Sequence, residues 1–499
     1  TGDLSRYFLA VKSILYVDPN NQFKMYLYAF LITFLAIALT ALYHRYNRTT
    51  RLINKIPGPK AWPIIGNALE FALPLGELFF YLLFISFGLT KLNFIAASLH
   101  FYHPYTYVTK WLGQGLLVSN GNKWFQRRRM LTKAFHFNIL KKFTKSFIEE
   151  SEECVKLLDK EVGKEQTDVQ KILSNTTLRV LCDTAMGFSD HDNMQSSIDS
   201  YLDSIRVLGQ CLTQRFAKVW LHYKPIYEST NIAKVEDEAV SKLHNFTNTV
   251  IRNRRKDFQE NLKEIDTEKD YENNEKFAML DLLLQNEKNG LIDNDGIREE
   301  VDTFMFAGHE TTATAMTFML MALANEPEIQ DKIYAEMQQI FGDSDRSPTM
   351  QDLSDMKYLE CCIKESMRLY PSVPLIIRNL TKDTVLRGYT IPAKTSLCIC
   401  IYDVHRRADL FPEPERFIPE RFFLENSKTR HPYSYIPFSA GHRNCIGQKF
   451  ALLELKVMMS ALIRKFRFEP VTKPSDVIYM TDMLLQCKNP VYVKFCSRK

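Results

Sequence analysis

The sequence predicts a mainly α-helical protein with small β-sheets, in which one large domain follows an N-terminal transmembrane helix. Apolar residues recur at three- and four-residue spacing from Trp124 to about Gln339, which is typical of packed helices. Short β-rich pieces occur only later, at 384–391 and 396–401. An uncharged apolar run precedes both regions, and no segment repeats at a fixed period. A chain of 499 residues is long enough to bury a large core.

The uncharged run comprises the 19 residues Met25–Tyr43, close to the roughly 20 that a helix needs to cross a bilayer. A cleaved signal peptide is the alternative, but the run is longer than the usual apolar core of such peptides, and no small-residue cleavage site follows it. Basic residues are denser after the run than before it, which places the bulk of the chain in the cytosol. We expect a lumenal segment at 1–24, an anchor at 25–43, a basic and proline-rich hinge at 44–67 and a cytosolic domain at 68–499.

The charge and cysteine content exclude several classes of function. A net charge of +6 is too small for a nucleic-acid-binding protein, but it fits an anionic membrane or an acidic partner. The 10 cysteines show neither paired zinc-ligand spacing nor a disulfide framework, so most of them are expected to be small buried side chains in a reducing compartment.

One cysteine stands in a glycine-framed loop, Phe438-Ser-Ala-Gly441-His-Arg443-Asn-Cys445-Ile-Gly447. Glycine turns expose backbone N–H groups that can stabilise a thiolate, and a helix predicted from Gln448 would direct its N-terminus at the sulfur. Phe438 can shield the sulfur from water, and Arg443 offers a cation to an anionic group. The alternative interpretation is a structural cysteine in a surface loop.

This string resembles the haem-binding signature of the cytochrome P450 family, Phe-x-x-Gly-x-Arg-x-Cys-x-Gly, with every defined position present. The resemblance covers the chain from about Trp111 to Phe495 and implies the fold of that family. It implies haem b bound through Phe438, Gly441, Arg443 and Gly447, with Cys445 as the thiolate ligand of the iron. The thiolate would favour O–O cleavage in O2, the co-substrate.

Two further motifs support the resemblance. Glu365 and Arg368 lie three residues apart, so they share one face of a helix. In the family such a pair is completed by an arginine of a Pro-Glu-Arg-Phe segment, which matches 414–417 here. The resemblance therefore implies a buried structural cluster of Glu365, Arg368 and Arg416. Trp124 and Arg128, at i and i+4, resemble a helix that binds haem propionates, and Arg378 matches another propionate contact.

A long helix is predicted from near Asp293 or Asp295 to Asn325, and it carries Ala307-Gly-His-Glu310-Thr311-Thr. In the resembled family an acid and an alcohol at this place deliver protons to bound oxygen, which implies a catalytic role for Glu310 and Thr311. The alternative is a solvated glutamate beside a threonine bonded back to the helix. His309 is expected to be a packing residue.

The segments 300–312 and 124–137 resemble the family-4 cytochromes, which often hydroxylate fatty acids at or near the terminal carbon. Several members carry Glu at the place of Ala307, esterified to the haem, so we expect haem to be held non-covalently here. Residues 68–110 are atypical of the family, as if about thirty residues were missing or replaced. This puts the region of the substrate entrance in doubt.

The resemblance implies a monomeric monooxygenase of the endoplasmic reticulum that draws electrons from NADPH through cytochrome P450 reductase, with cytochrome b5 as a further donor. Arg127, Arg129 and Lys133 are the candidate docking cations. The substrate would be a fatty acid, a hormone-like lipid or a xenobiotic such as an insecticide, bound in an apolar pocket formed by Phe304, Ala307, Pro374, Leu375 and Ile376. A haem-thiolate isomerase or dehydratase, or a non-catalytic haem binder, is the alternative.

Overall fold

The computed structural model describes residues 19–53, 55–56, 94–97, 104–188, 191–261, 278–481 and 483–498. The chain forms two compact units, residues 1–71 with 379–395, and residues 72–378 with 396–499. The sequence predicted one large domain from residue 68. The structure instead groups residues 379–395 with the N-terminal segment, a long-range pairing that no local pattern indicates.

The smaller unit contains α2 (Pro19–Tyr46), α3 (Arg48–Ile53) and the antiparallel hairpin of β4 (Thr384–Leu386) and β5 (Tyr389–Ile391). Arg48 Nη2 lies 2.5 Å from Asp383 Oδ2, which joins the start of α3 to the residue before the hairpin. The expected anchor falls within α2. In the part of the chain that the structure describes, no helix combines the length and the apolar character that a membrane span requires.

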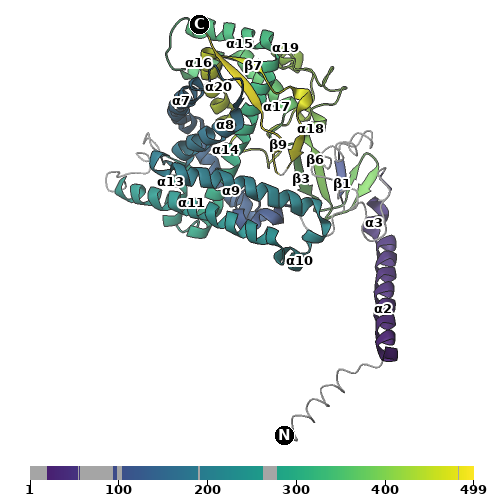
Figure 1. Cartoon of the computed structure of the whole chain (residues 1–499). Coiled ribbons are helices and arrows are strands. Elements are labelled where there is room, and N and C mark those ends of the chain that lie inside the picture. Colours follow the sequence, from purple (N-terminus) through teal and green to yellow (C-terminus); the bar gives the residue numbers. More distant parts are fainter. Residues whose placement is uncertain are drawn as a thin grey trace. The chain divides into compact units, whose positions relative to one another are not determined.

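The larger unit is mainly helical (Figure 1). Its α-helices are α5 (Thr109–Leu112), α6 (Gly121–Thr132), α7 (Phe137–Asp159), α8 (Val169–Leu181), α9 (His191–Ala217), α10 (Lys224–Glu228), α11 (Asn231–Asn261), α13 (Met279–Lys288), α14 (Asn294–Asn325), α15 (Pro327–Phe341), α16 (Met350–Asp355), α17 (Lys357–Leu369), α18 (Ile401–Val404), α19 (Leu424–Ser427) and α20 (Gln448–Lys465). Short helical turns connect them: η2 (Pro104–Val108), η3 (Lys133–Phe135), η4 (Cys182–Met186), η5 (Val219–His222), η6 (Pro419–Phe422), η7 (Pro432–Ser434) and η8 (Pro474–Asp476).

Helix α14 is the long helix predicted from the sequence, and it forms the centre of the core. Its N-cap is Asp293, whose Oδ1 accepts a hydrogen bond of 2.8 Å from Gly296 N. It ends at Asn325 because Glu326 and Pro327 leave the helical path and begin α15. Most of its side chains are buried, and it packs chiefly against α8 (Figure 1). Both predicted ends are confirmed.

The strands of the larger unit form small sheets. β1 (Phe94–Ala97), β6 (Ser396–Cys400) and β3 (Leu375–Asn379) form one sheet with β6 in the middle. The other sheets combine β2 (Thr167–Asp168), β10 (Tyr492–Ser497) and β7 (Phe466–Pro470), and pair β8 (Tyr479–Thr481) with β9 (Leu485–Cys487). Within the atypical segment 68–110, β1 runs antiparallel to β6 with Phe94 opposite Ile399, whereas residues 68–93 and 98–103 lie outside the described residues.

Candidate active site

The cysteine loop is held by two backbone hydrogen bonds. Cys445 N donates to Phe438 O at 2.9 Å, and Asn444 N donates to Gly441 O at 3.0 Å. Gly441 has φ +78°, a conformation that disfavours any residue with a Cβ, so this glycine of the motif is required by the turn. All ten cysteines are described, and Cys445 is the only exposed one. The loop therefore presents one accessible thiol at its end.

The surroundings of Cys445 stabilise its thiolate only in part. Burial of the surrounding loop raises the pKa of the Cys445 thiol, while the Gly447 N–H and the Arg128 charge act in the opposite direction. These two groups stabilise a thiolate without fully offsetting its desolvation. A metal ion would complete the stabilisation, because coordination deprotonates a thiol outright. A Cβ at Gly447 would stand 3.9 Å from Cys445 Sγ, an ordinary contact, which places Gly447 directly beside the sulfur.

Three arginines surround this loop. Arg128 donates to Asn444 O at 2.8 Å and to Asn444 Oδ1 at 2.9 Å. Arg443 Nη2 donates to Ser119 O at 2.8 Å, and Arg378 Nη2 donates to Ser439 Oγ at 2.9 Å. Among the described residues, no ion pair with a carboxylate involves any of these three side chains. Burial, together with the neighbouring cations Arg378 and Arg128, lowers the pKa of Arg443.

This donor set fits haem. The accessible thiol would hold the iron, and three arginines without carboxylate partners would hold the two anionic propionates. Trp124 belongs to the same region, since the Arg443 guanidinium lies 4.1 Å from its ring centroid. The structure thus brings together Trp124, Arg128, Arg378, Arg443 and Cys445, as the sequence predicted.

The acid of the predicted proton-delivery pair is buried. Burial acts to raise the pKa of Glu310, but His309 and the Gln486 amide outweigh it and hold the pKa below its ordinary value. Glu310 Oε2 lies 3.3 Å from His309 Nε2, and Gln486 Nε2 donates to Glu310 Oε1 at 3.4 Å. The solvated glutamate of the alternative interpretation is therefore wrong. Its other half is confirmed, because Thr311 is bonded back to the helix: this half-buried residue donates its hydroxyl to Ala307 O at 2.8 Å.

Aromatic contacts connect α14 to the cysteine loop. Phe304 stacks on Phe135 with ring centroids 5.6 Å apart, and Phe135 Cε1 would lie 3.9 Å from a Cβ at Gly447. Phe304 is buried, whereas Ala307, one turn further along α14, is exposed. In the predicted pocket, the small side chain of Ala307 is therefore accessible, whereas the ring of Phe304 is packed in the core.

The segment predicted to lie opposite α14 is joined to it by a hydrogen bond. Ser372 Oγ donates to Thr311 O at 2.8 Å, which places the start of this segment beside Thr311. Pro374 and Ile376 are buried, and Leu375 is half-buried. Of the three, Leu375 keeps the most surface for contact with a substrate.

Sequence reasoning placed the wrong arginine in the structural cluster. Glu365 and Arg368 are both fully buried and form a two-pronged ion pair of 2.8 and 2.9 Å. The third side chain is Arg421, whose Nε lies 3.3 Å from Glu365 Oε1. The Arg416 side chain is 69% exposed and pairs with Glu413, and only its backbone carbonyl accepts a bond from Arg368.

The error has a cause that is visible in the sequence. Pro-Glu-Arg-Phe occurs twice, at 414–417 and at 419–422, and the prediction used the first copy. The second copy forms η6, where Ile418 N also donates to Glu365 Oε1 at 2.8 Å. Arg416, five residues before Arg421, therefore has its side chain in solvent and not at Glu365. Recognising the second copy in the sequence would have made Arg421 a candidate for the cluster as well.

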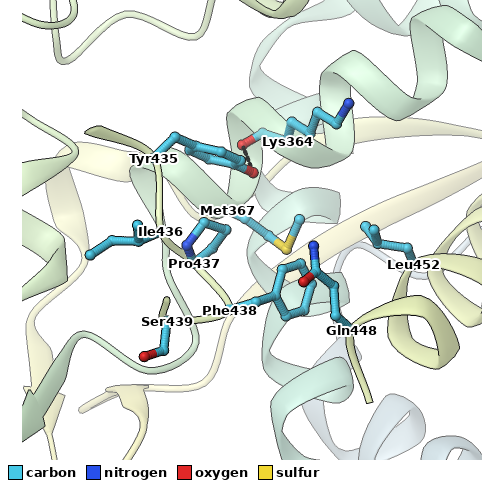
Figure 2. Close-up of a pocket in the computed structure, with 9 residues that line it drawn as sticks. All are labelled: Lys364, Met367, Tyr435, Ile436, Pro437, Phe438, Ser439, Gln448 and Leu452. Atoms are coloured by element: carbon cyan, nitrogen blue, oxygen red, sulfur yellow. Dashed lines mark hydrogen bonds between the residues drawn. The ribbon is translucent and has the colours of Figure 1, made fainter. Parts of the chain in front are cut away.

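A second correction concerns the expected docking cations. Arg127 is buried, with Nε 3.9 Å from Glu300 Oε1, so it cannot meet a partner. Arg129 and Lys133 are exposed, so their charges are accessible to a docking partner. A hollow with about 370 Å³ of space, including its open mouth, adjoins the cysteine loop, and Figure 2 shows Phe438 in its wall near Met367.

One buried acid was missed by the sequence reasoning. Glu454 on α20 is fully buried, and in the described part of the chain neither carboxylate oxygen has a hydrogen-bond partner of good geometry. Burial raises its pKa well above the ordinary value, with a smaller opposing effect from the Thr312 hydroxyl. The signal was available, since a glutamate interrupts the apolar run 450–455.

Comparisons with known proteins agree with this geometry. Residues 94–495 match the family model described as Cytochrome P450. Cytochrome P450 4c3 of Drosophila melanogaster is 38% identical, with 94% of each chain covered. Cytochrome P450 4c21 of Blattella germanica is 37% identical over 92% of this chain and 96% of its own, and human cytochrome P450 4V2 is 39% identical over 79% and 76%. The alignment with 4c3 spans 512 positions, more than the 499 residues here, so it contains internal gaps in this chain.

Proposed function

Since the chain belongs to the cytochrome P450 family, we propose that this haem-thiolate monooxygenase hydroxylates a lipophilic substrate with electrons from NADPH, delivered by a flavoprotein reductase. The observation that carries the proposal is the single exposed thiol of Cys445 among three arginines that lack carboxylate partners. When bound, haem supplies the activation of O2, which no amino-acid side chain can perform.

The chain's own residues would perform four tasks. Cys445 would bind the iron, and Arg128, Arg378 and Arg443 would orient the macrocycle through its propionates. Phe304 and Phe135 would exclude water from one side of the site. Glu310 and Thr311 would hold and pass protons, because the carboxylate is buried and the hydroxyl follows it directly on α14.

Fatty acids are the first substrates to test, with hormone-like lipids and xenobiotics such as insecticides next. The support is the likeness to family-4 relatives and the open, small Ala307 beside apolar Phe304 and Leu375. Purified protein, NADPH and a P450 reductase would be incubated with each class, and products would be identified by mass spectrometry. Product formation with a peroxide substrate and no reductase would favour an isomerase or dehydratase instead.

The spectrum of the reduced protein under carbon monoxide tests the cofactor before any substrate is known. We expect a strongly red-shifted Soret band, which Cys445→Ala abolishes and the matched control Cys496→Ser retains. A Soret band typical of a neutral ligand, or no haem, would refute the proposal. A normal band without turnover would favour a non-catalytic haem binder.

Attachment to the endoplasmic-reticulum membrane, with the catalytic unit in the cytosol, is part of the proposal. Its support is the uncharged run 25–43 and the exposed side chains of Phe30, Phe34 and Leu35 on α2. We expect the protein in the microsomal fraction after alkaline extraction. Deletion of residues 1–43 should move it to the supernatant.

A further inference from the structure

His309 adjoins Glu310 on α14, and its side chain is fully buried. His309 Nδ1 lies 2.5 Å from Met305 O, one helical turn earlier. A carbonyl oxygen can only accept a hydrogen bond, so Nδ1 must carry the proton of this contact. This assigns the tautomer of the neutral ring and leaves Nε2 as the atom that gains or loses a proton.

His309 Nε2 points to the carboxylate. It lies 3.3 Å from Glu310 Oε2, and no residue that the structure describes offers it a hydrogen bond of good geometry. A lone pair on Nε2 facing an ionised oxygen would be repulsive, so a proton belongs between the two atoms. Contacts of this kind tighten in the loaded enzyme.

The groups around this pair do not compete for that proton. From α9, the Tyr201 ring lies 5.9 Å from the His309 ring, and Arg206 is exposed and paired with Asp203. From β9, Gln486 contacts the opposite oxygen of Glu310. The pKa of Glu310 is lowered below its ordinary value, so at neutral pH the carboxylate holds no proton of its own to donate.

We propose that His309 stores the proton that Glu310 passes toward Thr311. His309 thus acts through Glu310 and does not itself deliver the proton. The inference deepens the proposed function and rests on it. The His309 Nε2–H bond breaks as the Glu310 Oε2–H bond forms, the ring becomes neutral while keeping its Nδ1 proton, and no electrons are transferred. Between turnovers the proton returns through Glu310, whose side chain is 12% exposed whereas that of His309 is 0% exposed.

The test uses His309→Asn in the haem-loaded full chain, with Tyr201→Phe as the matched control. Asparagine can still donate to Met305 O but has no atom in place of Nε2. The control removes a buried hydroxyl that has no hydrogen-bond partner among the described residues beside the same ring. Both variants should retain the red-shifted carbon-monoxide band, which shows that they fold and bind haem.

We expect His309→Asn to lower the product formed per NADPH roughly tenfold, less than the full effect of about 10²–10⁴ for a general acid, with peroxide formed instead. Tyr201→Phe should match the wild type. Unchanged coupling in His309→Asn at every pH would overturn the proposal.

A second readout does not need turnover. In ¹⁵N-histidine-labelled protein, the imidazole signal that His309→Asn removes should show protons on both ring nitrogens, and Glu310→Gln should shift it. A ring that carries no proton on Nε2, or a signal indifferent to Glu310→Gln, would contradict the inference. Failure of the proposed function would instead appear as wild-type protein that forms no product with NADPH and reductase.

Discussion

Replacing Arg421 and Arg416 separately with alanine distinguishes the two copies of Pro-Glu-Arg-Phe. Arg421 Nε contacts the fully buried Glu365, and its Nη2 donates to Glu413 O at 2.7 Å. Arg416 makes one ion pair at the surface, with Glu413. The two substitutions remove the same chemical group five residues apart, so each serves as the control for the other.

The loss of stability in Arg421→Ala depends on the contacts that Glu365 retains. A hydrogen bond to a charged group contributes about 1.5–3 kcal/mol, and breaking a buried ion pair completely costs about 3–5 kcal/mol. Glu365 retains its two contacts with Arg368 and the hydrogen bond from the Ile418 amide, so the cost lies at the lower end of these ranges. We expect Arg421→Ala to cost about 2 kcal/mol.

The assay is the temperature at which half of the haem Soret band is lost on heating. For a unit of this size, a loss of about 2 kcal/mol corresponds to a fall of roughly 2 °C in the midpoint. Arg416→Ala should leave the midpoint unchanged, because exposed ion pairs contribute little. Equal falls in both variants, or a larger fall in Arg416→Ala, would refute the assignment of Arg421 to the cluster.

Four further outcomes are expected. Thr311→Ala should divert electrons to peroxide while Thr311→Ser stays coupled, as measured by the ratio of product to NADPH; equal ratios would remove the hydroxyl from the proton path. The pKa of Glu454 in the folded protein is raised above its ordinary value of 4.5. As the pH rises above 4.5, the carboxyl loses its proton in the unfolded chain but keeps it in the folded one, so the free energy of unfolding falls by up to about 1.4 kcal/mol per pH unit. Glu454→Gln should therefore flatten the dependence of the thermal midpoint on pH between pH 5 and 8. Arg129→Gln with Lys133→Gln should slow reduction by the reductase and weaken its salt dependence, and unchanged rates would exclude docking there. Haem should separate from the polypeptide in denaturing chromatography, because Ala307 cannot form an ester.

The cysteine loop and helix α14 could be predicted because their signals are local. A defined string contains every residue of the loop, and α14 has its N-cap and a following proline in the sequence itself. The roles of Arg127 and Arg421 could not be predicted in this way. Whether an arginine faces a buried carboxylate or solvent depends on the path of the chain between distant segments, here 365 and 421 or 127 and 300.

The surroundings of His309 show the same limit. Its neighbour Glu310 is local, but the direction of each ring nitrogen depends on the rotamer within a packed helix. A sequence pattern can place an imidazole beside a carboxylate without indicating which atom faces it.

The pairing of β1 with β6 sets a practical limit on shortening the chain. β6 is the middle strand of its sheet, and the four residues Phe94–Ala97 satisfy its backbone groups along one side. A shortened protein that begins after Ala97 would turn β6 into an open edge, a template for intermolecular strand addition and aggregation. Versions trimmed for crystallisation or expression should begin well before Phe94.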